Sequence, residues 1–259
     1  MQRPGRLGIA APGEKDRRVL RARVVRLPRS IGGMALLHRA ELRPSKIELL
    51  QGWVPSRPWF AGDIGAELTS VGAFRFDDPA GEVGVETLLV RAGDGPVLQV
   101  PLTYRDAPLV GGEQWFIGTM EHSVLGQRWV YDGVGDPVYV QTVATATLTG
   151  GRQAELYLEI DGARVTREPT AVVAGTGTAG APVPPLVSVD EIRVRQERDA
   201  TVVEARDVVI VISRVLRTTE PEAQHRAVPA PADAAASAEL AGTWTGQPRP
   251  FPLVRVLAR

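Results

Sequence analysis

SKIELLQGWVPSRPWFAGD, residues Ser45–Asp63, opens the part of the chain that decides its fold. Two further stretches complete that part: VETLLVRAGDGPVLQVPLTYRD at Val85–Asp106 and QRWVYDGVGDPVYV at Gln127–Val140. Ser45 can cap a helix, Glu48 stands three residues later, and apolar side chains follow at helical spacing before two prolines end the pattern. The sequence therefore predicts a short helix followed by strands that are rich in aromatic side chains.

Alternating and β-branched segments predict the strands that follow this helix. The turn residues Gly93-Asp94-Gly95 predict a hairpin over Val85–Tyr104. Asp136-Pro137 predicts a second helix, with Asp as N-cap and Pro in the first turn, which ends at Gly150-Gly151. The expected strands are Ala66–Phe76, Val83–Arg91, Val97–Tyr104, Gln114–Met120 and Ser123–Tyr131.

Further antiparallel strands are expected on both sides of these elements. The β-branched run VVIVI at Val208–Ile212 is interpreted as a central, buried strand, with a homodimerising strand as the alternative. MALLHRAEL, beginning at Met34, is expected to contain an opening strand. The other segments are a hairpin over Ala154–Val173 that turns at Asp161-Gly162, a paired Val187–Gln196 and Thr201–Leu216, and a last strand at Leu253–Leu257.

This order of elements predicts an α+β fold in a single domain, with two helices and an antiparallel sheet that further antiparallel strands extend. Residues 1–33 are interpreted as a disordered basic extension or a non-native N-terminus. Residues 34–219 are expected to form the main domain, 220–238 a Pro/Ala-rich linker, and 239–259 a C-terminal strand that returns to the main domain.

Composition limits the class of protein. The chain has 259 residues, no cysteine and no apolar run near the length of a membrane helix, so we expect a cytoplasmic protein without disulfides. The net charge of zero is unevenly spread, because residues 1–33 carry nine basic and two acidic side chains. Such a basic arm can bind nucleic acid or an anionic membrane, but the rest of the chain is acidic, which makes nucleic-acid binding an unfavoured interpretation.

Three segments give the chain a resemblance to the N-terminal cap lobe of the actinobacterial maltokinases. They are PSRPWFAGD at Pro55–Asp63, LQVPLTYRD at Leu98–Asp106 and VYDGVGDP at Val130–Pro137. The resemblance covers roughly residues 36–150 and rests on the order and spacing of the segments. It implies a cystatin-like fold, in which a helix lies on a curved antiparallel sheet, and a link to α-glucan, maltose or trehalose metabolism.

The catalytic machinery of such kinases is not found in the sequence. Their chemistry needs a catalytic-loop Asp and a downstream Asn that holds magnesium. His38, His122 and His225 are followed by Arg, Ser and Arg, so no HGD or HRD occurs, and the chain contains no Asn. We therefore expect no kinase activity, no catalytic residues that we can identify and no resident cofactor.

Other catalytic motifs are equally weak. GTGTAG at Gly175–Gly180 matches the dinucleotide pattern, but the prolines that follow it forbid the helix on which a pyrophosphate would bind, so a loop is expected. P-loop and Gly-x-Ser-x-Gly motifs are missing, and the histidines lack metal-ligand spacing, so no metal site is expected. Paired carboxylates such as Asp77 and Asp78 do not identify a glycosidase by themselves.

The aromatic side chains leave two interpretations open. Their rings can stack on sugars, or they can fill the core, where a Trp N–H needs only one partner. Trp129 and Tyr131 are expected on one face of a strand, and Arg57 and Asp132 are expected as polar anchors at the contact of helix and sheet. The candidate ligand- or partner-contact residues are Arg57, Trp59, Tyr104, Trp115, Trp129, Tyr131 and Asp132.

The sequence thus predicts a non-catalytic accessory or binding module of α-glucan, maltose or trehalose metabolism. Its expected partner is an enzyme of that metabolism or a malto-oligosaccharide. Two alternatives stay open: a protein-docking scaffold, and an enzyme of unknown reaction whose site lies in the C-terminal half, where residues 187–216 and 242–257 would form part of the pocket wall.

Overall fold

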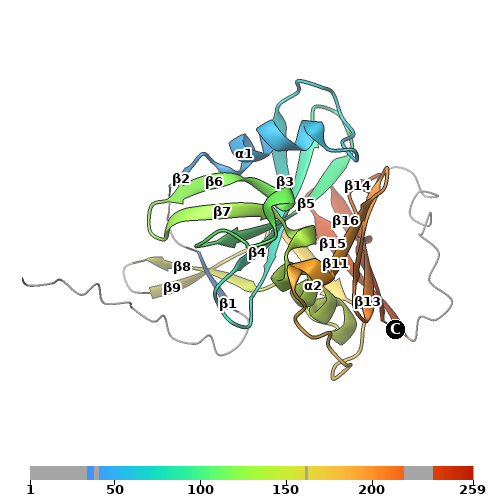
Figure 1. Ribbon diagram of the computed structural model, residues 1–259. Helices are drawn as coiled ribbons and strands as arrows, with labels where there is room; N and C mark the ends of the chain where they lie inside the picture. Colours follow the sequence, from blue (N-terminus) through green and yellow to red (C-terminus); the bar gives the residue numbers. More distant parts are fainter. Residues whose placement is uncertain (1–33, 38–40, 161–162, 219–235, 259) are drawn as a thin grey trace, which may run out of the picture.

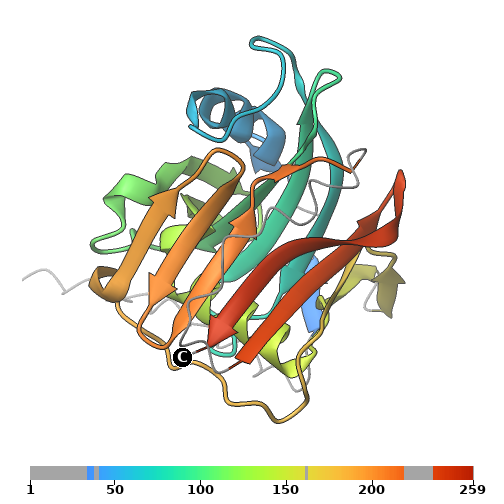
Figure 2. The same ribbon diagram turned by 90° about the vertical axis from the view of Figure 1, so that its right-hand side faces the viewer.

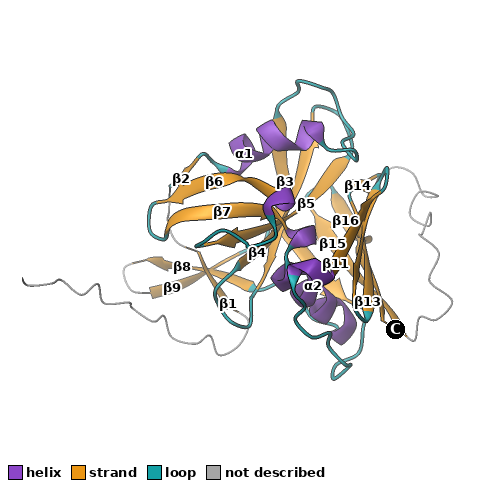
Figure 3. Ribbon diagram, viewed as in Figure 1, coloured by secondary structure: helices purple, strands orange, loops and turns teal. Residues whose placement is uncertain are grey.

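The computed structural model describes residues 34–37, 41–160, 163–218 and 236–258, which fold mainly into antiparallel sheets with two helices (Figures 1 and 3). The predicted basic extension, the turn at Asp161-Gly162 and the Pro/Ala-rich connection up to residue 235 lie outside the described residues.

Helix α1, Lys46–Trp53, begins as the sequence predicts. The Ser45 side chain accepts a hydrogen bond from the Glu48 amide at 3.2 Å, and the Glu48 carboxylate accepts one from the Ser45 amide at 2.7 Å. This reciprocal arrangement satisfies two amides that the helix cannot pair itself. Pro55 lies in the 3₁₀ turn η1, Val54–Ser56, that follows directly, so the predicted end of the helix is also confirmed.

Helix α1 lies on one face of a curled sheet, which we call the large sheet (Figure 1). In the described part of the chain this sheet has seven strands, and β14 pairs with the end of β5 that β7 leaves uncovered. The predicted hairpin of β4 and β5 is confirmed, since the two strands pair antiparallel along their length. The strands are β2 Leu42–Arg43, β3 Leu68–Phe76, β4 Gly84–Ala92, β5 Val97–Arg105, β6 Phe116–His122, β7 Gly126–Asp132 and β14 Val215–Leu216.

Side chains alternate across the large sheet and build a different core on each face. Leu88 and Val90 of β4 face α1, whereas Val85 and Leu89 of the same strand belong to the cluster on the opposite face. Helix α2, Pro137–Thr149, lies on that opposite face and is capped by Asp136 and closed by Gly150 in the left-handed conformation (φ 72°), as predicted.

A second sheet covers the other side of α2 and faces the viewer in Figure 2. Val143 of α2, Leu89 of the large sheet and Ile210 of the second sheet belong to one apolar cluster, so α2 is packed between the two sheets. Among the described residues the second sheet has six strands, in the order β10-β15-β16-β13-β12-β11. They are β10 Ala171–Gly175, β11 Ile192–Gln196, β12 Ala200–Ala205, β13 Val208–Ser213, β15 Ala236–Trp244 and β16 Gln247–Ala258.

Two expectations about strands need correction. The predicted strand Val187–Gln196 begins only at Ile192, because the 3₁₀ turn Val189–Glu191 precedes it. The predicted strand Thr201–Leu216 is three strands, because Arg206-Asp207 forms a tight turn and Arg214 interrupts the pairing before β14. Arg206 adopts the left-handed conformation (φ 41°), which sequence patterns assign to Gly or Asn. The run Val208–Ile212 is a central strand, as preferred, since it pairs on both sides.

The small third sheet departs from a purely antiparallel fold. Strand β1, Met34–Leu37, pairs parallel with β8, Glu155–Ile160, and β8 pairs antiparallel with β9, Ala163–Arg167. A parallel pair joins segments far apart in the chain, which a reading of neighbouring segments does not detect.

Candidate functional site

The sequence-predicted contact residues do not form one cleft. They lie in three parts of the large sheet: beneath α1, beside the buried carboxylate of Glu86, and on the opposite face around β6 and β7. The structure thus separates residues with a structural role from residues that a ligand can reach.

Beneath α1, aromatic rings and guanidinium groups form a continuous Trp–Arg stack of Arg57, Trp53, Trp59 and Arg214. The Arg57 guanidinium lies 4.7 Å from the centre of the Trp53 ring, and Trp53 lies 5.9 Å from Trp59. The Arg214 guanidinium lies 4.8 Å from the centre of the Trp59 ring. Arg57 therefore covers the half-buried Trp53, and Trp59 is only 1% exposed, so neither ring presents a free face to a sugar.

Asp132 closes this stack with a buried ion pair to Arg214. One terminal nitrogen of Arg214 donates to both Asp132 oxygens, at 2.9 and 2.6 Å, while its Nε donates to Thr201 of the second sheet at 2.8 Å. The Arg214 side chain is 0% and the Asp132 side chain 2% exposed. Asp132 is buried, as predicted, but its ion-pair partner is Arg214, between β13 and β14, and not a residue of α1.

The pKa shifts at this ion pair and the burial of its side chains indicate a structural role. Burial raises the pKa of Asp132, and Arg214 opposes that effect. Burial also raises the pKa of the nearby Tyr139 hydroxyl well above its ordinary value. Catalytic groups with shifted pKa values normally line a cleft, whereas both of these side chains are enclosed by the packing of helix and sheets.

Tyr104 belongs to a second polar cluster, beside the first turn of α1. Its hydroxyl donates to Glu86 at 2.8 Å, and the Lys46 ammonium also donates to Glu86. Burial raises the pKa of Glu86, but Lys46 and Arg75 outweigh it, and the net pKa lies below the ordinary value. Glu86 is only 5% exposed, so the cluster ties α1 to the sheet and leaves the carboxylate without access to a substrate.

Trp115 and Tyr131 serve packing on the other face of the sheet. Trp115 fills the space above Gly135, where a Cβ would lie 2.0 Å from the ring. The buried Tyr131 hydroxyl accepts a hydrogen bond from the Leu109 amide at 2.9 Å and so fixes the loop after β5. Tyr131 is only 3% exposed, and Trp115 is half-buried against the main apolar cluster.

The accessible aromatic surface lies on β6 and β7, and we call it the β6–β7 face. Register pairs Phe116 with Tyr131, Thr119 with Trp129 and Glu121 with Gln127, so these six side chains share one face of the sheet. Phe116 is 41% exposed and Trp129 is half-buried, while Glu121 and Gln127 are exposed. Trp129 belongs to none of the apolar clusters formed by the described residues.

A buried carboxylate fixes the border of this face. Arg105, the β5 neighbour of Trp129, forms two 2.7 Å hydrogen bonds with the Asp136 carboxylate, which also caps α2. Thr103 donates to the same carboxylate at 2.7 Å. The Asp136 side chain is 0% exposed, and the fork joins β5 to the start of α2 at the border of this face.

The groups on this face are suited to binding a ligand. Aromatic rings next to hydroxyl, amide and carboxylate groups can stack on the apolar faces of a polyhydroxylated ligand and hydrogen-bond its hydroxyl groups. Within the described residues, no group of three or more His, Asp or Glu side chains is placed to hold a metal ion.

The structure also decides the glycine-rich motif at Gly175–Gly180. The predicted loop at Gly175–Gly180 is confirmed. It begins at the end of β10 and contacts the end of α2, where a Cβ on Gly177 would lie 1.9 Å from the Leu148 carbonyl oxygen.

Neither helix in the described part of the chain has the length and apolar character required to cross a membrane.

Sequence reasoning missed Phe116 and Arg214. Phe116 stands at the start of a strand directly opposite Tyr131, a pairing that depends on the register of β6 against β7. Arg214 is the one charged residue between the apolar runs of β13 and β14, and that position is a usable signal for a buried cation. Its partner, 82 residues earlier in the chain, gives no such signal.

Comparison with known proteins matches residues 53–136 to the maltokinase N-terminal cap domain family. The match covers α1's last residue through β7 and ends at the cap of α2, so it contains most of the large sheet and the β6–β7 face. A comparison with curated proteins found no match to this chain.

Proposed function

Because residues 53–136 form a maltokinase N-terminal cap-like domain, we propose that this chain is a non-catalytic accessory or binding module of α-glucan, maltose or trehalose metabolism in the cytoplasm. In this proposal the cap is a cystatin-like unit, with α1 on the curled large sheet. Its partner is a malto-oligosaccharide or an enzyme of that metabolism.

The observation that carries the proposal is the composition and exposure of the β6–β7 face. Phe116 and Trp129 are the accessible aromatic rings there, and Thr119, Glu121 and Gln127 place polar groups beside them. A linear glucan presents alternating apolar faces and hydroxyl groups, which suits a strand surface that carries aromatic rings and polar groups side by side. The buried Tyr131 and the Arg105–Asp136 fork hold the surface in place without taking part in contact.

The test is a calorimetric titration of the protein with maltose, trehalose and malto-oligosaccharides of increasing length. We expect affinity that rises with chain length, because more sugar units reach the strand surface. Phe116→Ala and Trp129→Ala are each expected to weaken binding at least tenfold, a loss of about 1.4 kcal/mol. Ile64→Ala is the matched control, because Ile64 is 91% exposed on a loop outside this face.

The outcomes separate recognition of sugar from docking on protein. If no heat of binding is measured at millimolar sugar, direct glucan binding is excluded, and docking on an enzyme is the remaining form of the proposal. Equal losses in Ile64→Ala and Phe116→Ala would show that the contact is not at this face. Thermal melts of each variant exclude unfolding as the cause.

The enzyme alternative has one observation in its favour. A shallow groove of about 250 Å³ lies beside β10 and the hairpin of β15 and β16, within the C-terminal half. Trp244, Thr170 and Thr243 are among the residues that line it. This volume is below the usual range for ligand pockets. If a substrate screen found turnover by the protein and Trp244→Ala abolished it, the enzyme alternative would be favoured.

A further inference from the structure

The segment Ala181–Val187, APVPPLV, connects β10 to the 3₁₀ turn η4, Val189–Glu191, without forming a helix or strand. It contains three prolines and begins after Gly180, which adopts a positive φ of 82°. Two of its side chains are among the most exposed large apolar groups of the described chain: Val183 at 52% and Leu186 at 57%.

Local chemistry favours an extended left-handed helix for this segment. Each proline fixes φ at about −65°, and the α-helical region is disfavoured for each residue that precedes a proline. Pro182, Pro184 and Pro185 are fixed in the first way, and Ala181 and Val183 in the second. A polyproline II helix has three residues per turn, and over this length it spans about 22 Å.

The burial pattern repeats with the same period. Pro184 and Val187 are buried and Ala181 is half-buried, whereas Pro182, Val183, Pro185 and Leu186 are exposed. One edge of a three-sided helix therefore rests on the protein, at positions three residues apart. The two other edges, Pro182/Pro185 and Val183/Leu186, face solvent.

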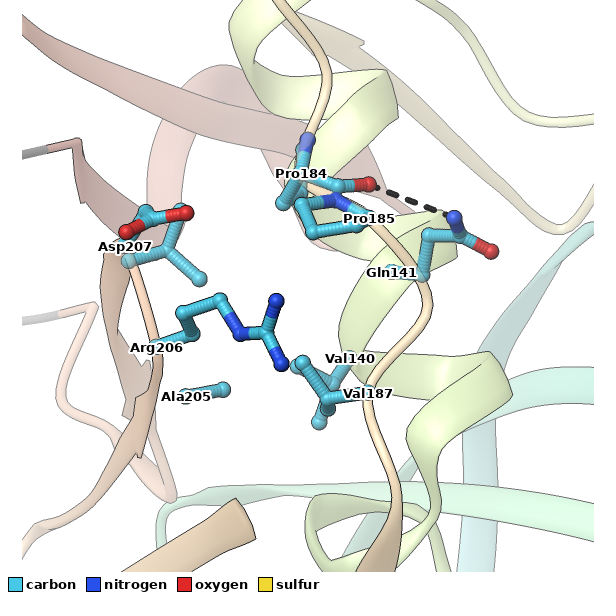
Figure 4. Close-up of a pocket in the computed structure, with 9 residues that line it drawn as sticks. Val140, Gln141, Pro184, Pro185, Val187, Ala205, Arg206 and Asp207 are labelled. Carbon is cyan, nitrogen blue, oxygen red and sulfur yellow. Dashed lines mark hydrogen bonds between the residues drawn. The ribbon is translucent and has the colours of Figure 1, made fainter.

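Contacts with α2 and the β12–β13 turn anchor the buried edge (Figure 4). The Gln141 side-chain amide donates to the Pro184 carbonyl at 3.2 Å, and Val187 enters the main apolar cluster. The space enclosed between these residues, Val140 and Arg206 has no room for a water molecule.

The C-terminal end of the segment is fixed by charge. Glu191 accepts hydrogen bonds from both the amide and the hydroxyl of Ser188, each at 2.9 Å, and it also pairs with Arg206 of the β12–β13 turn. The backbone hydrogen bond from Ser188 is the main reason why the pKa of Glu191 falls to about 2. The pair thus links the residues after the segment to the β12–β13 turn.

We propose that Ala181–Val187 is a docking segment for a partner protein whose aromatic-lined groove reads polyproline II helices. Such grooves, as in SH3 and WW domains, bind a helix that is already extended and therefore loses little entropy on binding. Here the folded chain supplies that extended form and presents the two edges that a groove needs, while the third edge is occupied by α2. This inference does not rest on glucan recognition.

The experiment measures binding of the full-length protein to an array of purified SH3 and WW domains by fluorescence polarisation. At least one domain is expected to bind, and Val183→Ala/Leu186→Ala is expected to weaken that binding at least tenfold. A free peptide of residues 178–190 is expected to bind more weakly than the protein, because it must pay the cost of ordering itself.

Val172→Ala is the matched control, since Val172 is exposed to 41% on β10 outside the segment. The substituted side chains are exposed, so both variants should melt like the wild type, and sugar titrations should be unaffected by either. If no domain in the array binds, or if Val183→Ala/Leu186→Ala binds as tightly as the wild type, the proposal is wrong.

Discussion

Replacing Arg214 by Met tests whether the buried ion pair joins the two sheets. Met has a side chain of similar length without the charge, so the substitution leaves the Asp132 carboxylate, which is 2% exposed, without its cation. It also removes the hydrogen bond to Thr201 and the contact with the Trp59 ring. Loss of one partner of a buried pair costs about 3–5 kcal/mol, which for a chain of this size lowers the melting temperature by about 6–20 °C.

Thermal unfolding followed by circular dichroism, with chemical denaturation at 25 °C, measures this change. The control is Arg195→Met, because the Arg195–Glu197 pair is exposed, with 60% and 31% of the two side chains accessible, and such pairs contribute about 0–1 kcal/mol. Arg214→Met/Asp132→Leu should recover at least half of the loss, since it removes the unpaired charge as well. An Arg214→Met variant within about 1 kcal/mol of the wild type would refute the reasoning.

Gly135→Ala should destabilise the fold by about 1–3 kcal/mol, because its Cβ would lie 2.0 Å from Trp115; an unchanged melt and near-ultraviolet dichroism would contradict this packing. Tyr104→Phe removes the hydrogen bond to Glu86 and should cost about 1.5–3 kcal/mol in chemical denaturation at pH 7, whereas a cost that persists undiminished at pH 3 would argue against the charged partner. Burial raises the pKa of Glu86, but Lys46 and Arg75 lower it by more, so the pKa in the folded state lies below the ordinary 4.5. The stability that ionised Glu86 contributes is therefore fully present above pH 4.5 and is lost as the pH falls through the pKa of the folded state. The difference in melting temperature between the wild type and Glu86→Gln should therefore shrink from pH 7 to pH 3, and a constant difference would exclude this linkage.

Part of the candidate site could be predicted from the sequence. Alternation along a strand correctly places Trp129 and Tyr131 on one face, but it does not distinguish a half-buried ring from a fully buried one. That difference depends on β6, whose Phe116 lies opposite Tyr131 and covers it. Trp59 shows the same limit, because its environment is made by Arg214 from the far end of the chain.

What the sequence by itself determined is local. The capping box of Ser45 and Glu48, the Asp136-Pro137 start of α2 and the glycine turn between β4 and β5 are each specified by residues a few positions apart. The match of residues 53–136 to a known cap domain likewise comes from the sequence alone.

Only the tertiary structure decided how these elements meet. The placement of α2 between two sheets, the parallel pairing of β1 with β8 and the contact of Asp132 with Arg214 all join segments that are distant in sequence. Burial of a side chain is a property of the surfaces that enclose it, so it is fixed when the sheets pack. For the same reason the proline-rich segment Ala181–Val187 has buried and exposed side chains, because Pro184 and Val187 pack against the protein beside α2.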